Sequence, residues 1–348
     1  MKRYLLFLAL LPGCAGYSAV PSSILAERLT KPPPAPLDIP KPPKTFALDL
    51  INRRKYAGVA MMGFNTGRML VRGEVVSAMK SWHAKLRLDV PAFLVSHPKE
   101  GNILVDTGLS RQTVGGGSFL LSVVDPAVPQ YRSRKGQDIV SQLSAAGVST
   151  DSVKWIVLSS LAPERAGMAA FFENATIVVA RAEWEWRKAR VAKDEAASLA
   201  LTVLAPRVKL VDIDARPACG PIVHCLDLFD DGTLYLADLA GRTPGTMGVL
   251  AILDGGPVML AGGAAFVVDN YLDLALPLKS QVEDLTLYWR SLHVLRALRE
   301  AVPQTVVLPG NDLRPLRLAG RNDVPVHDFR AKKSAAQERV KPNLRREK

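Results

Sequence analysis

The feature that most constrains this chain is a succession of short apolar runs, each about as long as a β-strand and bounded by turn signals. These runs lie at 90–96, 102–105, 155–158, 175–180, 208–213, 222–229, 234–239, 248–253, 258–260 and 305–308. Helical patterns interrupt them at 137–146, 165–172, 183–200 and 283–300. A sheet must bury its apolar face against another layer. We therefore expect an α/β (α+β) chain with two sheets and helices outside them.

Size and charge set the next limits. A chain of 348 residues, 48% of them hydrophobic, suits one large domain with appendages or two small domains. The formal net charge is +12, and the last stretch, 331–348, holds seven Lys or Arg residues against Glu338 and Glu347. This basic tail has no interleaved aromatic residues, so we expect a disordered end and no binding of nucleic acid.

The N-terminus has the pattern of an export signal. Lys2 and Arg3 precede a short apolar run, and Leu11-Pro12-Gly13-Cys14 resembles a bacterial lipobox, in which the cysteine is acylated. The alternatives are an ordinary secretory signal cleaved a few residues later and an uncleaved segment. The main interpretation predicts a lipoprotein of the bacterial cell envelope, on the periplasmic or extracellular side, with Cys14 as its lipid anchor in the membrane. The second predicts a soluble secreted or periplasmic protein.

This interpretation divides the chain into four parts. We expect a signal peptide at 1–14, a proline-rich linker at 15–45, a folded domain at 46–330 and the basic tail at 331–348. The prolines of the linker favour an extended, semi-rigid spacer.

Cys219 and Cys225 flank a Gly-Pro turn signal. In an exported protein they could be oxidised and close a small loop. The plainer interpretation is two free, buried thiols. A metal site that includes His224 is poorly supported, because a fourth ligand is missing.

Six ordered segments carry a resemblance to a known family. They are 93–95 with 103–108, 156–160, 171–176 with 182–184, 241–246, 259–265 and 308–312. With this spacing the chain resembles the metallo-β-lactamase-fold hydrolases from about Trp82 to Asp312, and most closely the branch that contains N-acyl-homoserine lactonases. The resemblance implies a four-layer αββα sandwich.

The same resemblance implies a hydrolytic centre of two divalent ions, usually zinc, that activate a water molecule. The positions that match the family's metal ligands are Ser160, Ala162, Glu164, Arg165, Arg242, Gly263 and Asn311. None keeps the residue type of the family, and arginine stays protonated and cannot ligate a metal. The five histidines, His83, His97, His224, His293 and His327, all lie elsewhere. We therefore expect a degenerate member with no catalytic residue and no cofactor.

Asp106 matches the family's carboxylate that supports the metals from below. It stands either for a residual polar network or for a backbone requirement of the turn Asp106-Thr107-Gly108. Arg165 and Arg242 are expected to neutralise Asp106 and Glu164 by pairing. The alternative is a residual pocket, formed by these four residues and Asn311, that binds a small anion. Ser159 and Ser160 lack a histidine base, so the case for a serine nucleophile is poor.

Two functions follow from these observations. The first is a catalytically inactive envelope lipoprotein with a binding or structural role, whose partner is a protein or a small anionic ligand in the cavity at the metal-ligand positions. The alternative is a divergent metal-dependent hydrolase of a lactone, ester or related bond. The missing ligands favour the first and the retained fold motifs favour the second, although fold alone does not fix function.

Overall fold

The computed structural model describes residues 39–41, 46, 58–81, 83–111, 128–192, 195–327 and 329. The predicted signal peptide with Cys14, almost all of the linker and the basic tail lie outside these residues. Within the described ranges, no helix combines the length and apolar character needed to cross a membrane.

The first sheet has eight strands, and seven of them follow the order β13-β1-β2-β3-β5-β6-β7. The eighth, β4, pairs with β1. Strands β1, β2 and β3 are antiparallel neighbours, whereas β3, β5, β6 and β7 run parallel. The bounds are β1 (Ala60–Arg72), β2 (Lys85–His97), β3 (Gly101–Val105), β4 (Gln130–Arg132), β5 (Val153–Val157), β6 (Thr176–Ala180), β7 (Val208–Val211) and β13 (Val326–His327).

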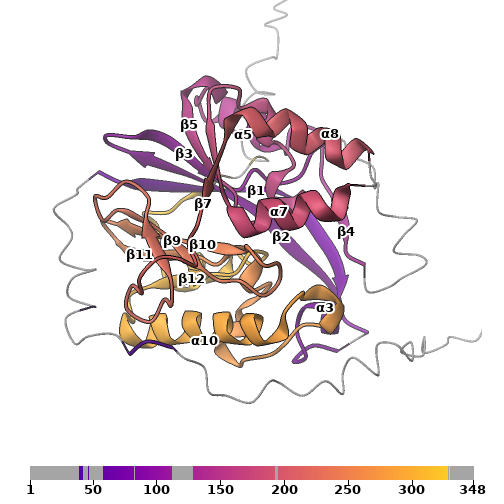
Figure 1. Cartoon of the computed structure of the whole chain (residues 1–348), viewed down its shortest axis with the longest axis vertical. Helices are drawn as coiled ribbons and strands as arrows, with labels where there is room; N and C mark the ends of the chain where they lie inside the picture. Colours follow the sequence, from indigo (N-terminus) through magenta and orange to yellow (C-terminus); the bar gives the residue numbers. More distant parts are fainter. Residues whose placement is uncertain are drawn as a thin grey trace, which may run out of the picture.

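The second sheet has five strands in the order β12-β11-β10-β9-β8 and lies below the first in Figure 1. Strands β8 to β11 are antiparallel, and β12 joins β11 in parallel. The bounds are β8 (Cys225–Asp227), β9 (Leu234–Asp238), β10 (Met247–Leu253), β11 (Gly256–Leu260) and β12 (Val306–Leu308).

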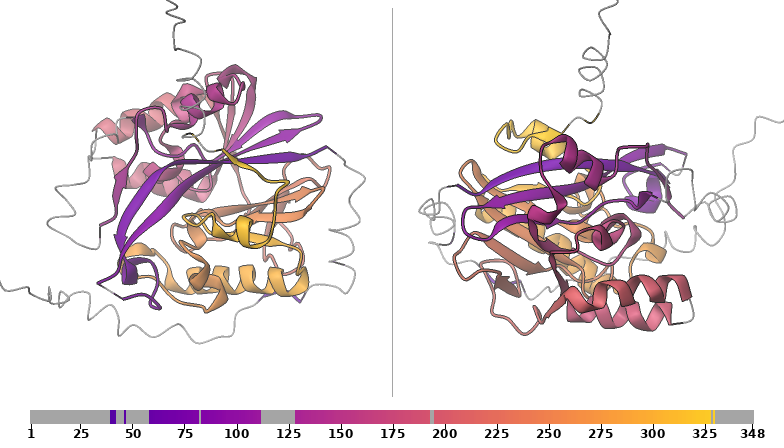
Figure 2. Two further views of the ribbon diagram at one scale, coloured as in Figure 1. Left: turned by 180° about the vertical axis from the view of Figure 1, so that it is seen from behind. Right: turned by 90° about the horizontal axis from the view of Figure 1, so that it is seen from above.

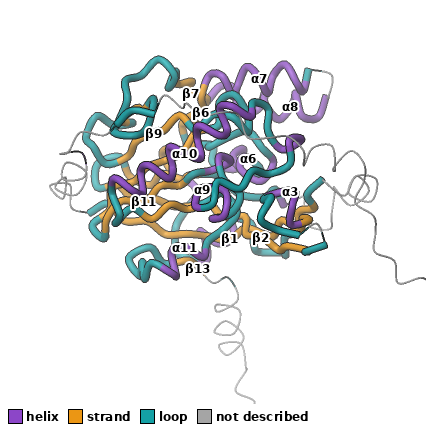
Figure 3. Tube along the Cα trace, turned by 90° about the horizontal axis from the view of Figure 1, so that it is seen from below, coloured by secondary structure: helices purple, strands orange, loops and turns teal. Residues whose placement is uncertain are grey.

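Helices cover the outer faces of both sheets (Figure 2). Helices α5, α7 and α8 pack on the first sheet, and α9 and α10 pack on the second. Figure 3 shows the second group from below, with α10 lying across the strands. The bounds are α3 (Gly73–Val76), α5 (Ile139–Ala145), α6 (Pro163–Ala166), α7 (Arg181–Val191), α8 (Glu195–Leu204), α9 (Val268–Leu272), α10 (Leu285–Ala301) and α11 (Arg314–Leu318). The expected four-layer αββα architecture is confirmed.

Successive side chains of the central strands enter different cores. On β10, Met247, Val249 and Ala251 face the core between the sheets, whereas Leu250 and Ile252 face α9 and α10. A strand points alternate side chains to opposite faces. A strand with a core on each side is therefore apolar throughout, which explains why these runs do not alternate with polar residues.

The predicted helix at 183–200 is wrong as a single element. The structure has two helices there, and α7 packs against α8 (Figure 1). Trp184 and Val191 of α7 and Leu201 and Leu204 of α8 all contribute to the core outside the first sheet. Burial of both apolar faces on the same sheet requires the chain to reverse between the helices, and no Gly or Pro marks this reversal in the sequence.

Other boundaries also differ from expectation. The helix expected at 165–172 is a short α6 followed by a 3-10 turn at Ala169–Phe171, and the strand expected at 222–229 is reduced to β8. The 13-residue strand β1 was not singled out in the sequence. It contains Asn65, Thr66 and Gly67, which break its apolar pattern where its register with β2 shifts.

The prediction of free thiols is wrong, because Cys219 and Cys225 form a disulfide. Cys219 also pairs with Ile222 in an isolated bridge, and the amide of Cys225 donates to the carbonyl of Pro217. These backbone bonds fold the segment before β8 into a tight loop that brings the two thiols together.

We predict that native protein, denatured without reductant, will resist alkylation at Cys219 and Cys225 and will be two hydrogen masses lighter than the reduced chain. Replacement of both cysteines by serine should lower the free energy of unfolding by about 2 kcal/mol, the value for so small a closed loop. Alkylation at both positions before reduction, read by peptide mass spectrometry, would contradict the disulfide.

Candidate functional site

The candidate site lies where strands of both sheets end. Asp106 follows β3, and the segment 159–165 follows β5. From the second sheet come the loop 240–246 after β9, the turn 261–264 after β11 and the segment 309–311 after β12. The amide of Met247 donates to the carbonyl of Ser159, and the amide of Gly310 donates to the carbonyl of Ala265. These bonds connect the segments to one another.

Asp106 accepts two hydrogen bonds from Ser159, one from its amide and one from its hydroxyl group, both at 2.8 Å. Its backbone has φ 56°, a left-handed conformation that aspartate tolerates better than most residues. The turn after β3 thus positions the carboxylate of Asp106. This carboxylate in turn binds Ser159, just after the end of β5. Asp106 has the left-handed backbone conformation that the first interpretation requires. It also makes the buried hydrogen bonds that the second interpretation, a polar network, requires.

Burial raises the pKa of Asp106 to about 6, and the nearby Arg165 only partly offsets this effect. The Nη1 atom of Arg165 is 3.5 Å from the carboxylate, and both side chains are almost fully buried. Removing a carboxylate from water disfavours its charged form. Asp106 therefore takes up a proton at a higher pH than an exposed aspartate.

Glu164 pairs with Arg242 at 2.8 Å. Burial alone would raise the pKa of Glu164, but the guanidinium groups of Arg242 and Arg165 outweigh it and lower this pKa below its usual value. The phenol of Tyr131, on β4, also hydrogen-bonds to Glu164. The guanidinium of Arg242 lies 4.6 Å from the ring centre of Phe266, a cation-π contact. Glu164 is therefore ionised, and its carboxylate binds Arg242 and Tyr131.

Arg165 connects the two sheets. Its Nη2 atom donates to Oδ1 of Asn311 at 3.2 Å, and Nδ2 of Asn311 donates to the carbonyl of Asp89 at 2.8 Å. The carbonyl of Arg165 accepts from the amide and hydroxyl groups of Thr107. A methyl group at Gly310 would lie 2.2 Å from Nη2, so glycine is required there for the guanidinium to fit.

The structure thus joins most residues that match the family's metal-ligand positions. Glu164, Arg165, Arg242 and Asn311 interact in two linked pairs, and a side chain at Gly263 would contact Arg242. Ala162 is the residue before α6, and its carbonyl accepts the amide of Arg165. Ser160 is buried, and its hydroxyl group has no hydrogen-bond partner among the described residues. We call Asp106, Glu164, Arg165, Arg242 and Asn311 the ion-pair cluster.

Sequence reasoning missed the residues that support this cluster. Glu183 accepts from the amide of Leu161 at 2.8 Å and from the hydroxyl group of Thr243 at 2.5 Å. It thereby joins the loop after β5 to the loop after β9, and burial raises its pKa. Tyr131 was also missed. Both make contacts with distant parts of the chain, for which a single sequence gives no signal.

These side chains do not fit a zinc centre. A catalytic zinc ion takes three protein ligands and an open position for water. Across the described ranges, three His, Cys, Asp or Glu side chains nowhere come together in a way that could hold a metal ion. Glu164, Arg165 and Asn311 are each 1% exposed. The guanidinium groups of Arg165 and Arg242 are permanent cations and cannot ligate a metal.

Comparison with known proteins gives the family context. No family model matches the sequence. The chain is 28% identical over 231 residues to the N-acyl homoserine lactonase AttM of Azorhizobium caulinodans, which is 64% of this chain and 82% of that relative. The N-acyl homoserine lactonase AttM of Agrobacterium fabrum matches to the same extent.

Solved structures agree on the fold. AiiA of B. thuringiensis, with N-decanoyl-L-homoserine bound at the active site, has a TM-score of 0.60 at 20% identity and covers 75% of this chain and 96% of its own. AidC, a dizinc quorum-quenching lactonase, has a TM-score of 0.53 at 16% identity, with 75% and 90% covered.

These relatives overturn the expectation that no cofactor is involved. AidC is a dizinc enzyme, and in another N-acyl homoserine lactone hydrolase the product is bound at the catalytic metal centre. The relatives are active hydrolases, so the expectation of an inactive protein is not supported either. The comparisons favour the alternative, a hydrolase of a lactone or ester, while the side chains at this site differ from a zinc ligand set.

We predict that Asp106→Asn will change the pH dependence of stability. The carboxylate is protonated in both states below pH 3.8 and ionised in both above about pH 6. Between these values the folded state binds more protons, so the stability of the wild type relative to Asp106→Asn should fall as pH rises, by about 3 kcal/mol in total. Urea unfolding from pH 3.5 to 7 measures this difference. Parallel curves would refute it, and the exposed Asp254→Asn serves as control.

A double-mutant cycle tests the pair between Glu164 and Arg242. Each single change, Glu164→Gln or Arg242→Met, should destabilise the protein by about 3–5 kcal/mol, because the remaining partner stays buried. The double variant should cost clearly less than the sum of the two. Additive losses in chemical unfolding would exclude this coupling. As a control, Arg181→Met removes one partner of the exposed ion pair between Arg181 and Asp212, and it should have little effect on stability.

The layer order agrees with the solved structures of this fold, and the sequence similarity extends over 231 residues. The chain has the metallo-β-lactamase fold and is similar in sequence, at 28% identity over 231 residues, to an N-acyl homoserine lactonase.

Proposed function

We propose that this protein acts by recognising a ligand or partner rather than by hydrolysis at the ion-pair cluster. The observation that carries the proposal is that the side chains at the metal-ligand positions are buried and bound to one another, and that two of them are arginines. Hydrolysis by two metal ions needs an open position for water between the ligands. Here Arg165, Glu164 and Asn311, at positions that match the family's metal ligands, are almost fully shielded from solvent.

The ligand class that suits the cluster is a small anion, such as a carboxylate. The Nε of Arg165, the Nη1 of Arg242 and the hydroxyl group of Ser160 are buried donors with no partner among the described residues. Buried polar groups are normally satisfied by protein, water or a ligand. Three such donors from neighbouring segments favour an acceptor, and two of them carry positive charge.

A place at the cell envelope completes the proposal. The N-terminal pattern that ends at Cys14 favours export with a lipid anchor. The disulfide between Cys219 and Cys225 supports an oxidising compartment, since such bonds persist outside the cytoplasm. Metabolic labelling with a radioactive or alkyne-tagged fatty acid tests the anchor, because Cys14→Ser should abolish the label.

The second candidate is a divergent hydrolase of a lactone, ester or related bond. The comparisons favour this candidate, because the relatives at 28% identity are N-acyl homoserine lactonases. The site geometry favours the first. Because the side chains do not fit two zinc ions, we derive no catalytic step for this candidate.

One experiment separates the candidates. We expect that the purified chain, supplied with zinc, will hydrolyse N-hexanoyl homoserine lactone and p-nitrophenyl acetate no faster than buffer, and that acetate will raise its melting temperature. Arg242→Met should remove the effect of acetate, because it removes one buried donor, whereas the exposed Arg181→Met should retain it. Zinc-dependent turnover that Glu164→Gln abolishes would refute the first candidate and support the second.

A further inference from the structure

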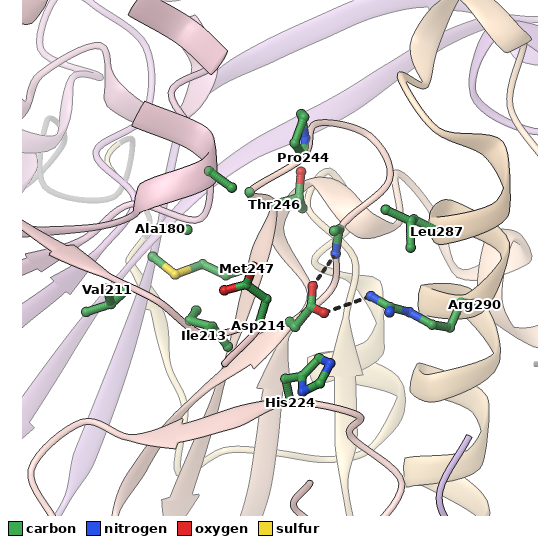
Figure 4. A pocket seen from close by; sticks show the side chains of 14 residues that line it. Ala180, Val211, Ile213, Asp214, His224, Pro244, Thr246, Met247, Leu287 and Arg290 are labelled. Atoms are coloured by element: carbon green, nitrogen blue, oxygen red, sulfur yellow. Dashed lines mark hydrogen bonds and ion pairs between the residues drawn. The ribbon is translucent and has the colours of Figure 1, made fainter. Parts of the chain in front are cut away.

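A cavity of about 210 Å³ lies between the ends of β6 and β7, the loop before β10 and the helix α10 (Figure 4). Its apolar wall comes mainly from Ala180, Val211, Ile213, Met247 and Leu287. No member of the ion-pair cluster lines it. The cavity is therefore distinct from the candidate site described above.

The cavity has one engaged pair of charges. Arg290 of α10 donates to Asp238 at 2.8 Å, and the same carboxylate accepts from the amide of Ala240 at 3.0 Å (Figure 4). Both side chains are largely shielded from solvent. The single arginine of the lining is thus already paired with a carboxylate through Nη2, whereas its buried Nε has no hydrogen-bond partner among the described residues.

Among the other polar side chains of the lining, the hydroxyl group of Thr246 is bonded to Thr243, and Asp214 and His224 are acceptors. Asp214 is exposed and has no hydrogen bond or ion pair with another described residue, and Figure 4 shows it beside Met247. Nδ1 of His224 lies 2.8 Å from the carbonyl of Arg216. A carbonyl only accepts hydrogen bonds, so Nδ1 carries the proton and Nε2 of the neutral ring is an acceptor.

We propose that this cavity binds a small organic cation, a primary ammonium on a short aliphatic body, with Asp214 as its counter-ion. An ammonium group donates three hydrogen bonds, and the free carboxylate and the imidazole accept them. The aliphatic part lies on the apolar wall. The volume is below the usual range for drug-sized ligands, so the ligand has few heavy atoms.

The charges that line the cavity disfavour an anionic ligand such as a carboxylate. Asp214 and Asp238 give two negative charges against one from Arg290, in a chain whose formal net charge is +12. A carboxylate ligand would meet an uncompensated Asp214 and an arginine that is already paired. This inference holds for either candidate function, because it concerns a different set of residues.

Ligand-observed NMR titrations of the purified chain with n-butylammonium, butyrate and 1-butanol test the proposal. We expect saturable binding of n-butylammonium only, weakened by added salt. Asp214→Asn should weaken it about two- to fivefold, the effect of losing one exposed ion pair. Asp254→Asn, at the other end of β10, should bind like the wild type.

A second variant gives an effect of opposite sign. Arg290→Gln releases the carboxylate of Asp238 and should strengthen the binding of n-butylammonium, provided that the near-ultraviolet circular dichroism spectrum is unchanged. Equal affinity of the wild type and Asp214→Asn, stronger binding of butyrate than of n-butylammonium, or no saturable binding would each overturn the proposal.

Discussion

The contacts that join the two sheets at their strand ends depend on a reciprocal exchange of guanidinium groups. Arg165 arises from the first sheet and donates to Asn311 of the second, and Arg242 arises from the second and pairs with Glu164 of the first. Charges this well buried are tolerated only when they are paired, so the exchange fixes the distance between the sheets at this edge. The carboxylate of Glu183 also connects the loop after β5 with the loop after β9, because it accepts hydrogen bonds from the amide of Leu161 and the hydroxyl group of Thr243. The absence of a side chain at Gly310 leaves room for Arg165.

AidC, a solved structure with the same fold, is a dizinc lactonase. In a zinc centre, imidazole and carboxylate side chains are held together by a shared cation. In this chain the cations are covalently part of the loops, and each reaches a partner on the opposite sheet. This chain nevertheless has the fold of the solved lactonase structures. The chemistry available at the site is different, because a guanidinium neither ligates nor activates water.

Much of the fold could be predicted from the sequence, since runs such as 248–253 are apolar throughout and only a strand covered on both faces needs that pattern. The positions of Glu164, Arg165 and Arg242 were predicted from motif order, and their pairing follows from charge. The break between α7 and α8 was not predictable, because the reversal depends on where Trp184 and Leu201 meet the sheet. The disulfide required the loop geometry before β8, and the role of Tyr131 required the pairing of β4 with β1.

The short strand β8 has a consequence for how the protein behaves at high concentration. It is the last strand of the second sheet, spans three residues and is preceded by a loop that the disulfide ties back. An outer strand exposes backbone amides and carbonyls that invite another chain to continue the sheet, and long flat edges lead to aggregation. Three residues beside a cross-linked loop give such a chain very little to align with. The cross-link therefore protects the colloidal stability of the folded protein as well as its resistance to unfolding.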